Sequence, residues 1–188
     1  MPSMAKTLGV GAALFGGVLA GVTANRALVQ MPGWERVGVI PWADFSRAEN
    51  HGLGLLFYPA IGLTALLLTV GTAVAYRFGR DARGARGLPI YLAVVLAIAG
   101  AVVTRLYLVP LNMSLREIGH NEAALQEIFF SAARWWRVND VLHLLTFGCN
   151  LWALTELWSN TRTNRATLDP SERLPTAPAN LHRTSRSE

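Results

Sequence analysis

The sequence predicts an all-α protein, an integral membrane four-helix bundle with up-and-down topology. The chain has 188 residues, of which 52% are hydrophobic and only 15% are charged, whereas about 25% charged is usual for a globular protein. Its mean hydropathy is +0.30. The charged residues divide the chain into four apolar blocks, and a spanning helix needs about 20 mostly apolar residues. Because backbone groups in hydrocarbon must be hydrogen-bonded within their own segment, we expect each block to be a helix.

The first expected span, residues 8–29, contains most of an uncharged run from 7 to 25. A small-residue site at 22–24 also fits a cleavable signal peptide, but the run is longer than the usual apolar core of about 7–15 residues, which favours a retained helix. Gly17 and Gly21 form a GxxxG pair. Small residues at this spacing let helix backbones approach closely, so this pair is a candidate contact for a homo-oligomer.

The second and third expected spans are residues 52–76 and 88–108. The block that holds the second span contains a single titratable residue, His51, at its beginning. The third span holds one charge, Arg105, about one turn from its end. An ionisable residue inside a span is costly and marks a candidate functional site.

The fourth expected span, residues 138–158, is the least apolar, and it reaches the required length only if Glu156 extends to the membrane interface. Residues 1–158 would then form one four-span transmembrane domain. The remaining segment, 159–188, is rich in Ser, Thr, Asn, Arg and Pro and lacks apolar periodicity. We expect it to be a disordered polar tail.

Arginines in the short loops predict the orientation of the bundle. The tail begins with Arg162 and Arg165, and four more arginines follow the second span. We therefore expect both termini in the cytoplasm of a bacterial inner membrane. The arginines that orient the bundle then account for the net charge of +5, so no nucleic-acid partner is needed to explain it. Membrane lipid is the expected partner. The four loop arginines are Arg77, Arg80, Arg83 and Arg86.

Tryptophans are expected to form a belt at the two membrane interfaces, where their amphipathic rings are favoured. A pocket lined by some of them is the alternative. The first loop, residues 31–49, holds two prolines and two tryptophans, and we expect it to be an ordered cap. The six tryptophans are Trp34, Trp42, Trp135 and Trp136 near the outer interface, and Trp152 and Trp158 near the inner one.

Polar residues gather at the predicted outer end of the bundle, and Arg105 is the most informative of them. Its long stem allows the guanidinium to reach the headgroups without any site. The alternative is an inward side chain paired with Asp140 or Glu49, because a charge that faces the bundle interior needs a partner.

Asp140 and His143 are three residues apart and share a helix face. A carboxylate beside an imidazole raises its basicity and fixes its tautomer, which suits a general base. The same pair is half of a carboxylate–histidine metal pattern, whose other half would be Glu49 and His51; these ligands are too few and poorly in register, so no metal is expected. The third alternative is that Asp140 and His143 only hydrogen-bond neighbouring helices. The lone Cys149 excludes a CxxC site.

Three local features resemble the anthrone-oxygenase-like family of small four-helix membrane proteins, over about residues 8–158. They are a glycine-rich first helix that leads through Asn25-Arg26, the segment Val109-Pro110-Leu111-Asn112, and the tryptophan-rich beginning of the fourth helix, 135–139. The resemblance implies oxidation of a polycyclic phenolic anthrone to a quinone by O₂, with no recognised organic cofactor.

The sequence therefore predicts a membrane oxidoreductase that acts on a flat, apolar phenolic, anthrone or quinone-type molecule. The alternative is a non-enzymatic membrane protein that serves in interaction, assembly or lipid binding, and a small transporter ranks third. In the enzyme, His143 would be the base, and Asn112 or Arg105 would stabilise the oxyanion. The predicted catalytic residues are His143, Asp140, Asn112 and Arg105, and the predicted substrate-binding residues are Asn25, His51, Trp136 and Asn139.

Overall fold

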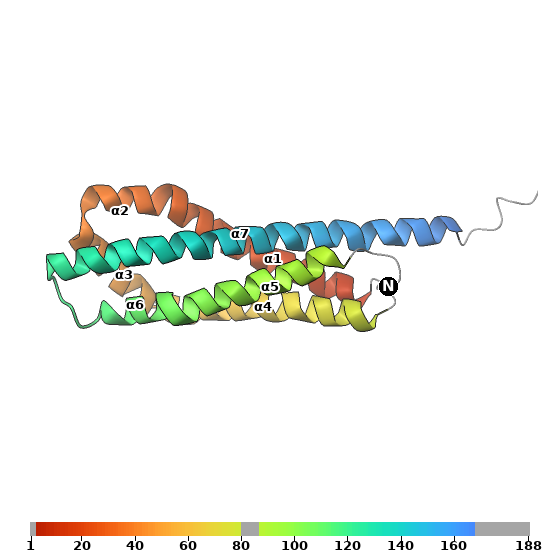
Figure 1. The fold of residues 1–188 in the computed structure, drawn as a ribbon, viewed down its shortest axis with the longest axis horizontal. Coiled ribbons are helices and arrows are strands. Elements are labelled where there is room, and N and C mark those ends of the chain that lie inside the picture. The colour runs from red at the N-terminus through yellow and green to blue at the C-terminus, as the bar shows by residue number, and fades with distance from the viewer. Residues whose placement is uncertain (1–2, 80–86, 168–188) are drawn as a thin grey trace, which may run out of the picture.

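The protein is an elongated bundle whose long helices run along one axis (Figure 1). The structure, a computed structural model, describes residues 3–79 and 87–167, with backbone only at 50–51 and 160–167. Every regular element in this part of the chain is a helix. Three helical segments are long and apolar enough to cross a membrane, so the predicted all-α membrane bundle is confirmed.

The first helical segment is longer than its expected span. Helix α1 (Met4–Asn25) continues through the π-helical turn η1 (Arg26–Gln30) into α2 (Met31–Val37). The segment ends at Gly38, whose φ of 94° lies in the left-handed region that glycine adopts at no steric cost. Helix α3 (Val39–His51) begins directly after it. The expected ordered cap over residues 31–49 is therefore built from two helices.

The second expected span agrees with the structure to within two residues, and the third begins as expected but continues six residues further. Helix α4 runs over Gly54–Phe78. Helix α5 (Leu88–Val103) continues through the π-helical turn η3 (Thr104–Leu108) into α6 (Val109–Ser114). Pro110 does not end this segment, because it lies in the first turn of α6, where its missing N–H costs least.

Helix α7 (Glu122–Thr167) has 46 residues and is much longer than the expected span 138–158. It starts in a segment that was expected to be a loop and continues through residues 159–167 of the expected disordered tail. Those nine residues contain no glycine or proline, and extending an existing helix is much easier than nucleating one. The rest of the expected tail, 168–188, lies outside the described residues.

The long helices form a ring in which α1 packs on α4 and α7, and α5 packs on α7 and α4. Successive members run in alternating directions along the axis (Figure 1). Glycines bring α1 close to α7: a Cβ atom on Gly17 would lie 3.3 Å from Phe147 Cε2, while one on Gly21 would meet nothing within 4 Å. Gly17, one half of the GxxxG pair, thus serves a contact inside the chain.

Candidate functional site

Two π-helical turns bring side chains to consecutive residues of α7. Arg26, the first residue of η1, donates a hydrogen bond to Asp140 Oδ1. Thr104, the first residue of η3, donates its hydroxyl to Asn139 Oδ1 at 3.3 Å. Since π-helical turns occur frequently at functional sites, residues 139 and 140 of α7 are the natural centre of a candidate site.

The Arg26–Asp140 ion pair is largely withdrawn from solvent. The arginine side chain is 19% exposed and the aspartate side chain 7%. Arg26 Cζ also lies 5.6 Å from the ring centroid of Trp136, within the range of a cation–π interaction. Asp140 therefore has an arginine partner, as a buried carboxylate requires, but this arginine is Arg26 and not Arg105, the partner in one of the two alternatives.

Arg105 is exposed on η3 and makes no ion pair within the described part of the chain. The reason is its position around the helix. Gly100 and Thr104 both face Asn139. Arg105 follows Thr104 and is turned by about 100° around the helix axis, so it does not face Asn139. Glu49, the other suggested partner, instead accepts a hydrogen bond from Tyr58 at 2.6 Å. The inward alternative for Arg105 is therefore wrong, and its exposed position is compatible with the other alternative, in which the side chain extends to the headgroups.

His143 lies one turn further along α7 and is half-buried. Its Cε1 would be 3.6 Å from a Cβ atom on Gly100, where α5 packs on α7. In residues 3–79 and 87–167 no hydrogen bond joins His143 to Asp140, whose Oδ1 atom is bound by Arg26. The structure thus has an arginine–aspartate pair in place of the predicted aspartate–histidine pair. His143 lies against Gly100 of α5 instead.

The other predicted site residues are more dispersed. Trp136 and Asn139 are buried beside Asp140, with 6% and 5% of their surface exposed. Asn25 is exposed at the end of α1, and Asn112 is half-buried on α6. The side chain of His51 lies outside the described residues. No group of three or more His, Cys, Asp and Glu side chains that could hold a metal occurs in the described part of the chain.

A cleft of about 200 Å³ lies between η1–α2 and α7, and Asp140 of the ion pair is one of its lining residues. It is smaller than typical ligand pockets, which occupy about 300–1,000 Å³. Trp136 and Asp140 form its polar and aromatic part, and Glu35 and Arg137 add charges. The remaining lining residues are Ala27, Met31, Pro32 and Ala133.

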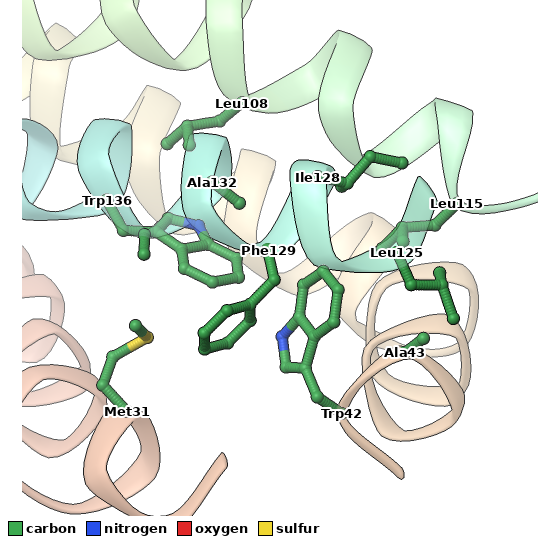
Figure 2. Close-up of a cluster of buried hydrophobic side chains, with 11 residues drawn as sticks. Met31, Trp42, Ala43, Leu108, Leu115, Leu125, Ile128, Phe129, Ala132 and Trp136 are labelled. Atoms are coloured by element: carbon green, nitrogen blue, oxygen red, sulfur yellow. The ribbon is translucent and has the colours of Figure 1, made fainter. Parts of the chain in front are cut away.

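Beside the cleft, α2 and α3 fold over the first half of α7 and enclose an aromatic cluster (Figure 2). The Trp42 ring lies 5.0 Å from Phe129 and 6.2 Å from Trp136, edge-on to both. Trp34 lies 5.8 Å from Trp136. Trp42 is completely buried, so Trp42 and Trp136 belong to the core and not to the expected interfacial belt. The two-helix cap, which hydropathy does not predict, is the reason.

Polar contacts fasten α3 to the loop before α7. Asp44 Oδ1 lies 2.9 Å from His120 Nε2, and this hydrogen bond is the main reason why the pKa of Asp44 is lowered below its ordinary value of 3.8. Arg47 Nε donates to the Leu115 carbonyl at 2.8 Å, and Arg47 also donates to the carbonyl of Gly119. His120, which showed no sequence signal of a partner, thus helps to hold the cap.

The fold defines a class: a helical membrane protein with a buried arginine–aspartate pair beside an aromatic cluster. The family model for anthrone oxygenase matches residues 54–149, just over half of the chain. The chain therefore belongs to the anthrone oxygenase family, as the sequence resemblance predicted. The match covers Trp136, Asn139, Asp140 and His143 but not Arg26. No curated protein and no solved structure matches the chain.

Proposed function

We propose that this protein oxidises a flat, apolar phenolic or anthrone-type molecule with O₂ at the cleft against Trp136 and Asp140. One observation carries the proposal: Asp140, which is buried and ion-paired with the half-buried Arg26, lines a mostly apolar cleft. Charged groups buried in a membrane bundle mark functional sites. Membership of a family described as anthrone oxygenase supports the reaction class.

The proposed reaction is balanced by one O₂ per substrate. The substrate loses both hydrogens of its ring CH₂ group; one oxygen atom becomes the new carbonyl, and the other leaves with the two hydrogens as water. The first step is removal of a proton, for which His143 and Asp140 are the candidate bases. Arg26 replaces Arg105 as the group that would stabilise the resulting oxyanion, since preorganised positive charge favours such a state. Trp136 offers a flat surface for the rings.

The test uses membranes that contain the wild-type protein, His143→Ala, Asp140→Asn or the control His120→Ala, together with empty membranes. Anthrone consumption and O₂ uptake are measured together. We expect the wild type to use one O₂ per quinone formed. The variant that removes the base should be slower by about 100-fold or more, while the exposed His120 on the α3 contact should be dispensable.

A wild type no faster than empty membranes, over several anthrones and hydroquinones, would refute the enzymatic proposal. If both site variants keep full activity, the reaction stands and both base assignments are wrong. The alternative function, a non-enzymatic membrane interaction or lipid-binding protein, has two observations in its favour. The cleft is small, and Asp140 is already neutralised by Arg26.

We also propose that α7 is a fourth span, with both termini in the cytoplasm of a bacterial inner membrane. The polar residues that lower its hydropathy, among them Asn139, Asp140 and Asn150, are buried, whereas Val141 and Leu145 are 53% and 51% exposed. The exposed face of α7 is thus apolar and suited to contact with lipid. Reporter fusions placed after residues 83 and 159 should both report the cytoplasm, and an external signal from either would contradict this topology.

A further inference from the structure

The cleft between η1–α2 and α7 carries two charged residues that the proposed reaction does not use. Glu35 lines the cleft from α2, and Arg137 lines it from α7. Both are exposed, and neither makes an ion pair within the described part of the chain. The third charged residue of the lining, Asp140, is already paired with Arg26. The free charges of the cleft are therefore one acid and one base, and they sum to zero.

These two charges lie at different depths along the bundle. Helix α2 runs toward the end of the bundle at which α7 begins (Figure 1). The two helices are in register at Trp34 and Trp136, whose ring centroids are 5.8 Å apart. Glu35 follows Trp34 toward that end of the bundle, whereas Arg137 follows Trp136 toward the middle. The base is therefore the deeper of the two charges, and the acid is the outer one.

The length of α1 places the cleft at the level of the lipid headgroups. Helix α1 has 22 residues and is about 33 Å long, whereas the hydrocarbon core of a bilayer is about 30 Å thick. The residues of η1 and α2, which follow α1, therefore lie where hydrocarbon gives way to headgroups. Next to Ala27, at the inner end of the cleft, Leu28 and Val29 are 76% and 63% exposed and offer an apolar surface to acyl chains.

The order of chemical groups along the cleft corresponds to that of an aminophospholipid. Such a lipid has acyl chains, then a phosphate and then a primary ammonium group, from the hydrocarbon outward. The cleft has apolar residues, then Arg137 and then Glu35 in the same direction. A zwitterionic headgroup can therefore form a charge-assisted hydrogen bond with each of them. An anionic headgroup without an ammonium group would leave Glu35 without a partner and repel it.

We propose that the cleft binds the headgroup of a zwitterionic aminophospholipid such as phosphatidylethanolamine. Arg137 donates hydrogen bonds to the phosphate, and Glu35 accepts them from the ammonium group. The cleft volume of about 200 Å³ suits a headgroup, and the acyl chains stay in the bilayer against Leu28 and Val29. This inference goes beyond the proposed oxidation and does not require it, although a substrate that enters the same cleft would have to displace the lipid.

The test is native mass spectrometry of the purified full-length protein in detergent, titrated with dioleoyl phosphatidylethanolamine, phosphatidylcholine or phosphatidylglycerol. We expect phosphatidylethanolamine to bind about fivefold more tightly than either of the others, the upper value for one exposed ion pair. Phosphatidylcholine has no N–H group to donate, and phosphatidylglycerol has no ammonium group. Equal affinity for the three lipids, or tighter binding of phosphatidylglycerol, would overturn the site. So would equal binding of water-soluble glycerophosphoethanolamine, because the ligand would then not be a lipid.

Variants of the two exposed charges test their separate roles. Glu35→Gln should remove the fivefold preference, and Arg137→Gln should weaken the binding of all three lipids, because each has a phosphate. The controls Glu127→Gln and Arg134→Gln, at exposed positions of α7 outside the cleft, should bind as the wild type does. Glu35→Arg combined with Arg137→Glu keeps the net charge but reverses the order of the charges, so the preference should be lost. A reversed variant with wild-type affinity and preference would contradict the proposed order.

The outcomes also separate this inference from the proposed function, because lipid affinity and O₂ uptake are measured on the same preparation. A preference for phosphatidylethanolamine without O₂ uptake would support the lipid site and refute the oxidase. O₂ uptake without a lipid preference would refute the lipid site alone.

Discussion

Arg26→Gln is expected to lower the free energy of unfolding by about 3–5 kcal/mol, the usual cost of removing one partner of a buried ion pair. The substitution leaves the carboxylate of Asp140 buried at 7% side-chain exposure without its cation. Loss of the guanidinium should also abolish anthrone oxidation, because no other described group makes an ion pair with Asp140.

Arg105→Gln is the matched control. Its side chain is exposed, and exposed substitutions usually change stability by no more than about 0.5 kcal/mol. Unfolding in detergent, followed by circular dichroism, measures stability, and O₂ uptake in membranes measures activity. If Arg105→Gln is the more damaging variant, the arginine pairing seen in the structure is not the functional one.

A double variant tests the physical reason for the Arg26 effect. Arg26→Met together with Asp140→Leu removes both charges and keeps apolar volume, so most of the lost stability should return. Activity should stay absent, because the site has lost its polar groups. A double variant as unstable as Arg26→Gln would show that the stability comes from packing and not from the ion pair.

Hydropathy was sufficient to predict three of the helices, because the apolar stretches of α1, α4 and α5 are set by the thickness of the membrane. Their ends were less predictable. The segment that starts with α1 extends to Val37, because the helix continues through η1 and Pro32 lies in the first turn of α2, where proline is tolerated. Residues 122–137 of α7, which carry charged residues on their exposed side, were expected to be a loop.

The alternative that paired Asp140 with Arg105 failed for a specific physical reason. At its end of the bundle, Asp140 had two arginines at a suitable depth, Arg26 and Arg105, and depth alone does not distinguish them. The choice depends on which face of α5 contacts α7. That face is set by Gly100 and Thr104, whose small side chains carry no charge signal in a sequence.

The aromatic cluster was unpredictable for a related reason. Trp42 and Trp136 are 94 positions apart in the numbering, and tryptophan near a span is usually interfacial. Only the turn at Gly38, which folds α3 back over α7, brings them together. Spacing within one element predicted the neighbours Asn139, Asp140 and His143, whereas contacts between elements depended on a turn that sequence periodicity does not reveal.

Gly100→Leu is expected to separate α5 from α7 at the candidate site. A Cβ atom on Gly100 would lie 3.6 Å from both Asn139 Oδ1 and His143 Cε1, which is ordinary contact and leaves no room for further atoms. Overpacking of this kind costs about 1–3 kcal/mol. It should also break the Thr104–Asn139 hydrogen bond, and a displacement of about 1 Å near a reacting site can lower activity by about 100-fold.

Two variants isolate this steric effect. Gly100→Ala adds only the Cβ atom that the structure accommodates, and alanine favours a helix over glycine by about 1 kcal/mol, so stability should be unchanged or slightly higher. Ala101→Leu adds the larger side chain on an exposed position next door and should leave O₂ uptake intact. Equal activity of Gly100→Leu and Ala101→Leu would mean that the close approach of α5 and α7 does not position Asn139 and His143. A selective loss in Gly100→Leu, with Gly100→Ala active, would tie the function to that contact.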